Sequence, residues 1–553
     1  MQKILLIAFL FLGMSTSLFA EDVKSESTLE KETQTEQTIS QKINHWFEPK
    51  VAAMEKVLFW DPFTAIGIHD PVVYDENGKP LLDEQGKPIT KDIPFIVVWL
   101  VLGAAFFTVR MKFINITGIK HSIDLIRGKY DKPGDVGEVS HFQALATALS
   151  GTVGLGNIAG VAIAITVGGP GATFWMIVAG IMGMSLKFTE VTLGVKYRNI
   201  SKAGIVSGGP MFYLEKALKE KKLLGFSLWP LGKVLAVTYA VLMIGASIGG
   251  GNMFQSNQTF MQFELIEPAF VGHGAWVGMA LAIIVGVVII GGIKSIAKVT
   301  EKVVPIMAGI YVLAALVVIG VHYTEIPAVF GIIIDGAFNA DALKGGFLGV
   351  LIVGFQRASF SNEAGVGSAT IAHSAVKTDE PISEGFVALV EPVIDTVLIC
   401  TMTALVIVFT GYYTPELANG MSGSQLTSAA FGSVISWFPY ILAFAIMLFA
   451  ISTMITWAYY GLNSFKFLFG GLFKKFNLSQ KTLNYTFFFI FLSFTVIGAA
   501  AELGAVVAFA DMMILTMAFP NIIGLLILAP EVYGDLKIYI AKLKSGEIKK
   551  FED

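Results

Sequence analysis

The sequence predicts an all-α polytopic membrane protein with about eleven transmembrane helices, ten of them arranged as a 5+5 inverted repeat. Of the 553 residues, 54% are hydrophobic and 15% are charged, and the mean hydropathy is +0.68. Soluble domains carry more charge than this. Apolar segments near the ~20 residues needed to cross a bilayer follow one another. Two of them contain Gly-rich polar breaks, at Ser150–Asn157 and Ser359–Ser368.

Each apolar segment from residue 94 onward is expected to be one span. The eleven lie near 94–112, 140–168, 171–196, 233–251, 274–293, 303–321, 345–372, 384–411, 431–462, 484–502 and 510–530. If the first is set aside as an extra N-terminal helix, ten remain and divide into five and five. The two segments that contain the breaks open the two sets.

The distribution of Lys and Arg predicts the orientation. If the first span runs outside to inside, 27 Lys and Arg lie in inner segments and only Lys344 lies in an outer loop after it. Such asymmetry is expected from the positive-inside rule. An odd number of spans per repeat then makes the two halves inverted. In secondary transporters with inverted repeats, the binding site lies near the membrane midplane between the helices that open the two repeats.

The ends of the chain are expected to lie outside this membrane domain, 94–530. Residues 1–20 are typical of a signal peptide, with an uncleaved anchor as the alternative because Leu18 is not small. Residues 21–93 predict a periplasmic extension, with a polar disordered part, an amphipathic helix from Trp46 to Leu58 and a small hairpin near 75–88. Residues 531–553 follow the last predicted span and are expected to form a cytoplasmic tail. We therefore expect a multi-pass protein of the plasma membrane, a bacterial inner membrane, with its N-terminus outside and its C-terminus cytoplasmic.

The first break offers groups for two kinds of ligand. Unwinding at Gly154 and Gly156 exposes amides at the start of the outer half-helix, where the dipole favours an anion such as a carboxylate. The inner half ends in free carbonyls, from Ser150 to Val153, which suit a hard cation such as Na⁺, and Asn157 adds a side-chain oxygen. Close helix packing through small residues is the alternative.

The second break contains ionisable and polar side chains. Glu363 follows Ser361 and Asn362, and an ionisable residue at this depth indicates a functional site. Glu363 is expected either to bind a cation or to hold the geometry of the break by accepting backbone N–H bonds. Arg357 is expected to pair with an acid.

Two acids of the next span are the candidates for that pairing. Glu391 and Asp395 are four residues apart on one helical face. A structural ion-pair network is the favoured interpretation, and proton coupling is the alternative. Lys187 and Glu190 are expected to pair with each other at the inner end of their own span.

Further polar side chains lie in two other spans. The hydroxyls of Ser452 and Thr453 can face the carbonyls of the first break, or bond back to their own helix. Trp457 can close a small apolar pocket, or lie in an interface belt. Gln255 belongs to a polar helical face after 233–251 that lines the entry path or is solvated in an outer loop. The single cysteine, Cys400, is expected to be a packed small residue.

Several blocks of the sequence resemble the alanine or glycine:cation symporter family. The matching blocks are GNIAGVA at 156–162, GGPGATFWM at 168–176, KYR at 196–198, GGPMFY at 208–213, GNMFQSN at 251–257, FSNEAGVGSA at 360–369 and WAYYG at 457–461. The resemblance implies the ten-helix inverted-repeat fold of sodium-coupled amino-acid carriers (LeuT-type, APC superfamily). It also implies uptake of alanine or glycine with Na⁺, or sometimes H⁺.

The stretch Val153–Asn157 is also similar to the first-helix break of the neurotransmitter:sodium symporters. That similarity implies one Na⁺ site formed by the carbonyls of Ser150 and Val153 with the hydroxyls of Ser452 and Thr453, and a second involving Thr152 and Asn157. It implies further that the substrate carboxylate meets Gly154, Leu155 and Gly156, and that the amino group meets Ser361, Asn362 and Gly365. Many family members have Thr where this chain has Leu155, a departure that bears on which small amino acid is carried.

The expected function is Na⁺-driven uptake of a small neutral amino acid by alternating access. No cofactor is expected besides the coupling ion, and no Gly-rich phosphate loop predicts a nucleotide. The expected partners are the amino acid and membrane lipid, with no nucleic acid. The alternatives are proton coupling through Glu363 or the Glu391 and Asp395 pair, a cation channel, or a membrane-embedded enzyme using Glu363 and His373.

Overall fold

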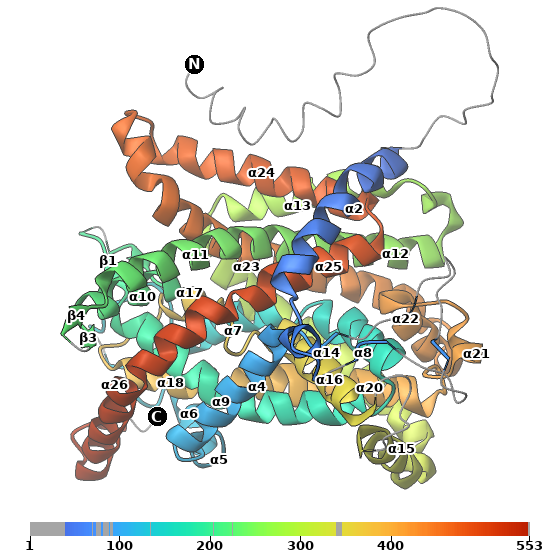
Figure 1. The fold of residues 1–553 in the computed structure, drawn as a ribbon, viewed down its shortest axis with the longest axis horizontal. Helices are drawn as coiled ribbons and strands as arrows, with labels where there is room; N and C mark the ends of the chain where they lie inside the picture. The colour runs from blue at the N-terminus through green and yellow to red at the C-terminus, as the bar shows by residue number, and fades with distance from the viewer. Residues whose placement is uncertain are drawn as a thin grey trace, which may run out of the picture.

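The computed structural model describes residues 39–550, except 69, 73–78, 81–87, 89–91, 133, 203, 224 and 339–345. The predicted signal peptide, the polar segment up to residue 38 and most of the predicted hairpin therefore lie outside the described residues. The described part is almost entirely helical (Figure 1).

Seven helical stretches in the described part of the chain are long and apolar enough to cross a membrane. They are α9 (Ala172–Lys196), α11 to α12 (Trp229–Ile266), α14 (Gly292–Val321), α18 to α20 (Pro381–Phe409), α23 (Phe438–Lys475), α24 (Gln480–Ala500) and α25 to α26 (Leu503–Ser545). A bent pair adds an eighth candidate, because α7 (His141–Thr152) meets η2 and α8 (Gly156–Gly168) at 51°. The protein is therefore a mostly helical multi-pass membrane protein.

Three of the predicted spans correspond to shorter apolar helices. They are α4 (Phe95–Arg110), α13 (Gly274–Ile289) and α16 (Gly346–Asn362). At about 1.5 Å per residue, a 16-residue helix such as α4 covers ~24 Å, less than the ~30 Å hydrocarbon core. Every predicted span thus overlaps a helix, while eleven complete crossings and the inverted repeat stay predictions.

Several predicted boundaries are wrong. The span at 233–251 continues through the π-helix η3 (Gly249–Met253) into α12 (Phe254–Ile266). The segment 431–462 begins inside α22 (Gly423–Val434), before α23. The tail is largely helical, because α26 (Ala518–Ser545) extends past residue 530, and α15 (Ile326–Phe338) was not predicted. Hydropathy marks where apolar residues end, whereas buried polar residues let a helix continue inside the protein.

The remaining elements are short, except for the 20-residue helix α2. The helices are α2 (Ile39–Leu58), α3 (Pro62–Ala65), α5 (Ile114–Thr117), α6 (Ile119–Ile126), α10 (Pro210–Lys219), η4 (Pro268–Phe270), η5 (Tyr323–Glu325), α17 (Thr370–His373) and α21 (Pro415–Ala418). The span 381–409 is composed of α18 (Pro381–Ala388), α19 (Val390–Pro392), η6 (Val393–Cys400) and α20 (Thr401–Phe409). Two antiparallel hairpins pair β1 (Asn199–Ile200) with β2 (Val206–Ser207) and β3 (Lys222–Leu223) with β4 (Phe226–Ser227).

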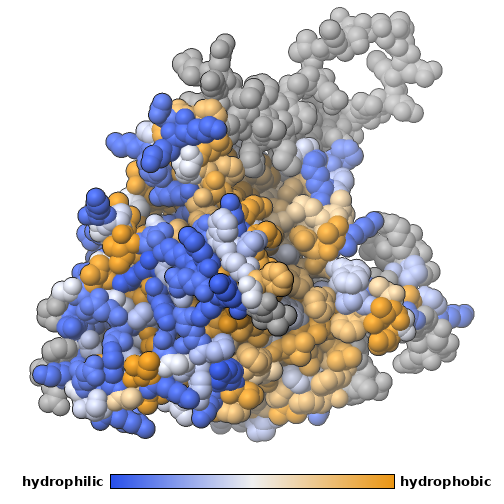
Figure 2. Space-filling model, turned by 60° about the vertical axis from the view of Figure 1, so that its left-hand side comes forward, coloured by the Kyte–Doolittle hydropathy of each residue, from blue (hydrophilic) through white to orange (hydrophobic). Residues whose placement is uncertain are grey.

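The surface has the hydropathy expected of a protein in a bilayer. Figure 2 shows hydrophilic residues gathered on one part of the molecule and a broad apolar surface beside them. Large apolar side chains project outward from the spans: Leu102, Ile283 and Leu313 are 58%, 63% and 66% exposed. Soluble monomers rarely expose apolar patches of this extent.

The amphipathic helix predicted before residue 58 is confirmed as α2. It packs against α25 (Leu503–Thr516), which it crosses in Figure 1. Phe47 and Val51 are buried, and the Phe47 ring lies 5.5 Å from that of Phe509. α2 therefore lies against the helical domain through its apolar face.

Asp61 connects the described part of the extension to the start of α4. Its carboxylate accepts hydrogen bonds from the amides of Phe63 (2.8 Å), Thr64 (3.1 Å) and Ile93 (3.0 Å). Burial raises the pKa of Asp61, but the hydrogen bonds outweigh burial, so the pKa lies below its ordinary value.

Acidification is expected to weaken this connection. A carboxyl group with a lowered pKa stabilises the fold above its unfolded pKa, and that contribution is lost as the pH falls through the folded pKa. We expect amide hydrogen exchange at Ile93, relative to the unfolded chain, to quicken on acidification, and Asp61→Asn to show the fast exchange already at pH 7. The exposed Glu48→Gln is the control; equal protection of Ile93 in both variants would contradict this role of Asp61.

Candidate functional site

The inner half of the first broken helix ends at Thr152, and side chains from α23 satisfy its last carbonyls. The Thr453 hydroxyl donates to the Ser150 carbonyl at 3.0 Å, and the indole N–H of Trp457 donates to the Gly151 carbonyl at 3.2 Å. Carbonyls at a helix end need such partners when they are buried. One face of α23 thus holds the end of α7.

Of the two contacts predicted for the Ser452 hydroxyl, the structure shows the bond back to its own helix. Its hydroxyl donates back to Phe449 of its own helix at 2.9 Å, while its carbonyl accepts a 2.7 Å hydrogen bond from the Ser150 hydroxyl. The Thr152 hydroxyl also donates within its helix, to Ala148 at 3.4 Å. Of the predicted hydroxyls, only that of Thr453 points to a carbonyl of the first break.

The amides of the first break are bonded to side chains. The Gly154 amide donates to Asn157 Oδ1 at 2.9 Å, and the Leu155 amide donates to Gln255 Oε1 at 3.2 Å. Gln255 lies on α12, and its own amide group donates to the Gly250 carbonyl at 2.9 Å. Gln255 is 3% exposed, so the interpretation of this polar face as a solvated outer loop is wrong.

The second break follows α16 and contains left-handed backbone. Glu363, Gly365 and Gly367 have φ of 57°, 83° and 88°, conformations that glycine adopts without strain. The Glu363 carboxylate accepts a hydrogen bond from the Ser368 hydroxyl and so spans the break. One prediction was that Glu363 holds the break by accepting backbone N–H bonds. The donor is instead the Ser368 hydroxyl, so that part of the prediction is wrong.

Asp395 joins the two breaks. This fully buried residue of η6 accepts hydrogen bonds from Asn157 Nδ2 of the first break (2.6 Å) and from the Ser361 hydroxyl of the second (2.9 Å). A third comes from Thr396 at 2.7 Å. Cys400, buried as predicted, lies 3.3 Å from Asn157 Nδ2. Residues of three helical segments thus meet at one carboxylate.

Two predicted site residues of the second break, Asn362 and Gly365, bond to groups other than Asp395. Asn362 donates to the Thr396 hydroxyl at 2.9 Å and accepts from the Ala364 amide at 2.9 Å. The Gly365 carbonyl accepts from Asn521 of α26 at 2.8 Å. A Cβ on Gly365 would meet only Leu100, Leu186 and Ile522 side chains, so Gly365 faces α4 and α9.

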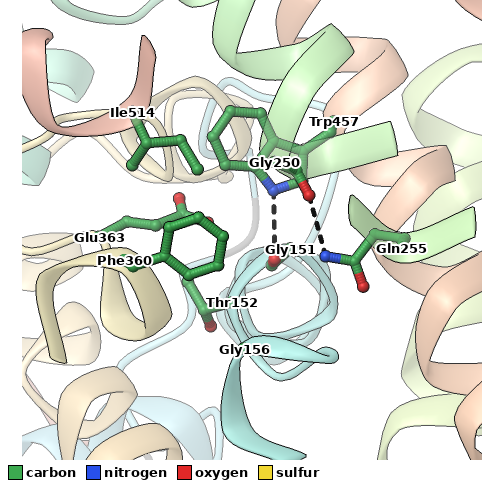
Figure 3. A pocket seen from close by; sticks show the side chains of 9 residues that line it. All are labelled: Gly151, Thr152, Gly156, Gly250, Gln255, Phe360, Glu363, Trp457 and Ile514. Carbon is green, nitrogen blue, oxygen red and sulfur yellow. Dashed lines mark hydrogen bonds between the residues drawn. The ribbon is translucent and has the colours of Figure 1, made fainter. Parts of the chain in front are cut away.

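A small pocket lies where the breaks meet, and Trp457 covers one side of it (Figure 3). Its lining comes from the first break, the second break, η3 to α12, α23 and α25: Gly151, Thr152, Gly156, Phe360, Glu363, Gly250, Gln255, Trp457 and Ile514. Five of these were predicted site residues: Thr152, Gly156, Gln255, Glu363 and Trp457. Trp457 is 2% exposed, which rules out an interface belt.

The other predicted residues do not line the pocket. These are Ser150, Val153, Gly154, Leu155, Asn157, Arg357, Ser361, Asn362, Gly365, Glu391, Asp395, Ser452 and Thr453. Leu155 is completely buried, and its amide rather than its side chain is directed at Gln255. Leu155 is not among the residues that line the pocket.

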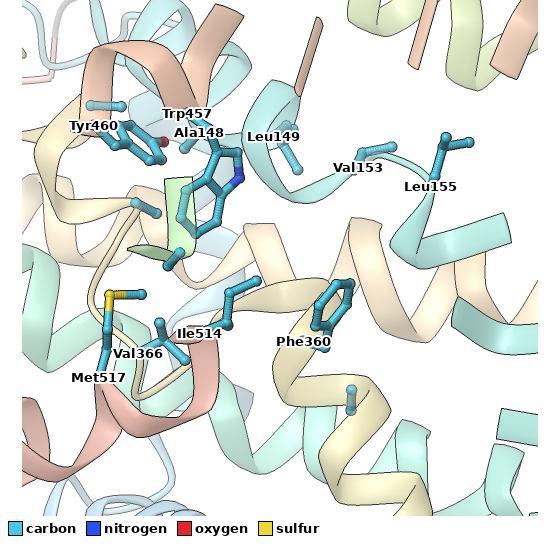
Figure 4. Close-up of a cluster of buried hydrophobic side chains, with 14 of the residues drawn as sticks. Ala148, Leu149, Val153, Leu155, Phe360, Val366, Trp457, Tyr460, Ile514 and Met517 are labelled. Atoms are coloured by element: carbon cyan, nitrogen blue, oxygen red, sulfur yellow. The ribbon is translucent and has the colours of Figure 1, made fainter. Parts of the chain in front are cut away.

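Sequence reasoning missed the apolar half of the lining. Phe360 and Ile514 belong to a cluster of buried hydrophobic side chains beneath Trp457 that includes Val366 and Met517 (Figure 4). Nothing in the sequence distinguishes an apolar residue that lines a pocket from one that only packs in the hydrophobic core. Gly250 did have a signal in the sequence, because three consecutive glycines open the polar block at 249–257.

The predicted ion pairs are wrong. Arg357 contacts Asp511 of α25, not Glu391 or Asp395. Glu391 pairs with Lys187 at 3.0 Å, and Glu190 accepts instead from Asn521 at 3.1 Å. Spacing along one helix predicts which charges share a face, but it does not predict which helix packs against that face.

We expect Arg357→Gln to destabilise the protein and to disturb the pocket. The guanidinium carbon lies 5.4 Å from the ring centroid of Phe360, a lining residue. Removing one partner of a buried ion pair leaves the Asp511 charge unpaired, at a cost of about 3–5 kcal/mol. Thermal unfolding in detergent measures the loss. The exposed Arg127→Gln serves as the control, and equal melting temperatures for the two variants would rule out the predicted role.

Broken helices, a buried pocket between them and an apolar outer surface define a multi-pass membrane carrier. The chain belongs to the sodium:alanine symporter family, whose model matches residues 80–553. The predicted family resemblance is thereby confirmed. As a member of this family, the protein is a Na⁺-coupled amino-acid transporter.

Curated relatives align along most of their length. The sodium/alanine symporter AgcS of Methanococcus maripaludis is 38% identical over 460 residues, 83% of this chain and 96% of the relative. The probable sodium/glutamine symporter GlnT of Bacillus subtilis is 34% identical over 456 residues, 82% and 89% respectively. Among solved structures, MhsT in complex with L-phenylalanine matches with a TM-score of 0.46 and 16% identity, over 73% of this chain and 100% of that one.

Proposed function

We propose that this protein carries alanine or glycine together with Na⁺ by alternating access, with the substrate in the pocket between the two breaks. The observation that carries the proposal is that pocket: both broken helices contribute to it, and the buried Trp457 closes one side. Breaks in spanning helices persist where they line a cavity, and in secondary transporters that cavity holds the substrate.

The lining of the pocket supports a small substrate. The two relatives are named for alanine and for glutamine, so family membership alone leaves the side chain open. Phe360, Trp457 and Ile514 contribute apolar side chains to this lining, which suit a hydrogen or methyl side chain.

The proposed Na⁺ site is formed by neutral oxygens at the end of α7. The Ser150 carbonyl and Thr453 hydroxyl already lie 3.0 Å apart. A hydroxyl can turn its hydrogen away and present a lone pair, so both oxygens can bind a hard cation. The Val153 carbonyl and Ser452 complete this proposed set, and Thr152 with Asn157 form the proposed second site.

The proposed substrate contacts require rearrangement of existing hydrogen bonds. We assign the carboxylate to the amides of Gly154, Leu155 and Gly156. Asn157 and Gln255 hold the first two amides, so both side chains must release them when the carboxylate binds. The amino group is assigned to Ser361, Asn362 and Gly365. This exchange of partners links substrate binding to the geometry of the first break.

The orientation is part of the proposal. We place the N-terminus outside the plasma membrane and the C-terminus in the cytoplasm, because the predicted spans then put 27 Lys and Arg in inner segments and only Lys344 in a later outer loop. The ten spans after the first then form two inverted five-helix repeats. In that arrangement the two broken helices enter the pocket from opposite sides.

Uptake of radiolabelled alanine and glycine into proteoliposomes tests the function. Gradients of Na⁺, K⁺ and protons are imposed one at a time. We expect accumulation only with a Na⁺ gradient. Accumulation that follows the proton gradient alone would establish the proton-coupled alternative, and no accumulation under any gradient would favour a channel.

Thr453→Val tests the cation site. We expect the Na⁺ concentration for half-maximal uptake to rise about tenfold, equivalent to about 1.4 kcal/mol, because one oxygen ligand is lost at nearly constant volume. Thr486→Val is the control, since that hydroxyl bonds only within α24, to Thr482 at 2.9 Å. An unchanged Na⁺ dependence in Thr453→Val would exclude this residue from the site.

A further inference from the structure

A row of five buried ionisable side chains lies outside the pocket. All five are at most 4% exposed, and they come from five different helices: His141 (α7), Glu384 (α18), His373 (α17), Glu391 (α19) and Lys187 (α9). None of them belongs to the proposed Na⁺ site, which consists of neutral oxygens.

The five side chains form one continuous chain of contacts. Nδ1 of His141 and Nδ1 of His373 contact the two oxygens of the same carboxylate, Glu384, the latter at 2.5 Å. Nε2 of His373 faces Glu391 Oε2 at 3.5 Å, and neither atom has another hydrogen-bond partner among the described residues. The second oxygen of Glu391 contacts Lys187 at 3.0 Å. Each histidine is thus joined through its Nδ1 to Glu384.

The row extends from the protein surface toward the pocket. At one end, Nε2 of His141 lies 4.0 Å from Asp131, whose side chain is 49% exposed, a gap that one water can bridge. At the other end, Glu391 is four residues before Asp395, the carboxylate that joins the breaks. Lys187 also interacts electrostatically with Glu363, which lines the pocket.

Other charged groups surround the row. Arg198 donates to the carbonyls of Ser374 and Val376, next to His373, and interacts with the Glu384 charge. Glu190 faces Lys187 from the same helix. On the loops at the exposed end, Asp135 interacts with His141, and Asp379 interacts with Asp135. The row is therefore flanked by charges of both signs.

Burying five ionisable side chains costs desolvation free energy, which suggests that the row has a function. Replacing buried ion pairs by apolar residues is often neutral or stabilising, so stability alone does not account for five of them. Chains of His and carboxylate side chains inside membrane proteins are the groups that relay protons. Imidazole suits this use because one ring nitrogen can accept a proton while the other releases one.

We propose that this row is a proton path, and that the transporter returns a proton through it in exchange for Na⁺. His141 starts with its hydrogen on Nδ1 and His373 with its hydrogen on Nε2. A proton from the Asp131 side binds His141 Nε2 while Nδ1 gives its hydrogen to Glu384. Glu384 gives a proton to His373 Nδ1 while Nε2 gives its hydrogen to Glu391, and each ring then returns to its first tautomer.

When Na⁺ leaves its site at the end of α7, Glu363 in the pocket lining loses a compensating charge. The proton supplies that charge during the return of the empty carrier and is released when the carrier has opened to the other side.

The test of the proton exchange rests on the proposed function, and its outcomes distinguish failure of the exchange from failure of the proposed function. Proteoliposomes contain a trapped pH dye and equal K⁺ with valinomycin on both sides, so that Na⁺ movement creates no voltage to drive protons. An inward Na⁺ gradient and labelled alanine are then applied. We expect the lumen to become alkaline in proportion to alanine uptake. Uptake with no pH change, or with acidification, would overturn the proton exchange, whereas absence of uptake would overturn the proposed function instead.

Variants of the row test the path itself. In His373→Gln and His141→Gln we expect the pH change per alanine to fall at least tenfold, with Na⁺-dependent uptake still measurable. His121→Gln is the matched control, because that histidine is half-buried and contacts Tyr539 at 2.9 Å, outside the row. If either row variant transports alanine with the unchanged proton ratio, the path is refuted. If neither variant folds, the wild-type pH measurement alone decides the exchange.

Discussion

Asp395→Ala is expected to abolish Na⁺-dependent amino-acid uptake and to lower the melting temperature. The carboxylate accepts hydrogen bonds from Asn157, Ser361 and Thr396 at 2.6–2.9 Å, all in the buried interior. Without it, the hydroxyls of Ser361 and Thr396 lose their acceptor, each at a cost of about 1–3 kcal/mol. Asn157 keeps the backbone carbonyl of residue 395 as an acceptor, at 3.0 Å. Because Asn157 and Ser361 belong to the two breaks, the loss removes the carboxylate that links the two broken helices.

The controls separate positioning from general destabilisation. Asp395→Asn keeps the volume and one acceptor oxygen, so we expect an intermediate melting temperature and residual uptake. Asp335→Ala removes an exposed carboxylate from α15 and is expected to behave as wild type. Asp395 lies outside the pocket lining, so its role is to position other groups. Wild-type uptake in Asp395→Ala would contradict that role.

Gly251→Ala is expected to have a comparable effect by a steric route. A Cβ at this π-helical position would lie 2.3 Å from both Cβ and Cγ of Trp457. The indole has little room to move, since it is 2% exposed and is hydrogen-bonded to Gly151 at 3.2 Å. Overpacking of this kind costs about 1–3 kcal/mol. It also displaces the side chain that covers the pocket, so we expect uptake to be lost.

Gly309→Ala is the matched control for this prediction. Gly309 lies in α14, and a Cβ there would meet nothing within 4 Å. Since alanine has the higher helix propensity, this variant is expected to be as stable as wild type or slightly more so. Uptake and thermal unfolding are measured for both variants. If Gly251→Ala transports as well as Gly309→Ala, close packing at Gly251 does not hold Trp457 in place.

The two breaks were predictable because they rest on local chemistry. Glycines and polar residues cluster inside apolar segments at 150–157 and 359–368, and the structure interrupts the helix after Thr152 and after Asn362. The residue types and spacing along each single segment carry this information. The contact between Thr453 and the first break was one of two alternatives from the residues, and only the family resemblance favoured it.

The pairing of charges was not predictable in the same way. Arg357 has acids within 40 residues, yet it contacts Asp511, more than 150 positions away. Asn157 and Ser361 likewise meet on Asp395, a convergence that no spacing along the chain indicates. Such contacts depend on which helix faces pack together, and many apolar faces are interchangeable on hydropathy alone.

The sequence by itself determined the class of molecule, the two interrupted helices and the family, because hydropathy, glycine content and motif order are properties of single segments. Only the tertiary structure decided that Asp395 joins the breaks, that Phe360 and Ile514 line the pocket and that the histidines connect through Glu384. The physical reason is that these relations arise from packing between helices. A buried polar group accepts the nearest partner the packing provides, whatever its distance along the chain.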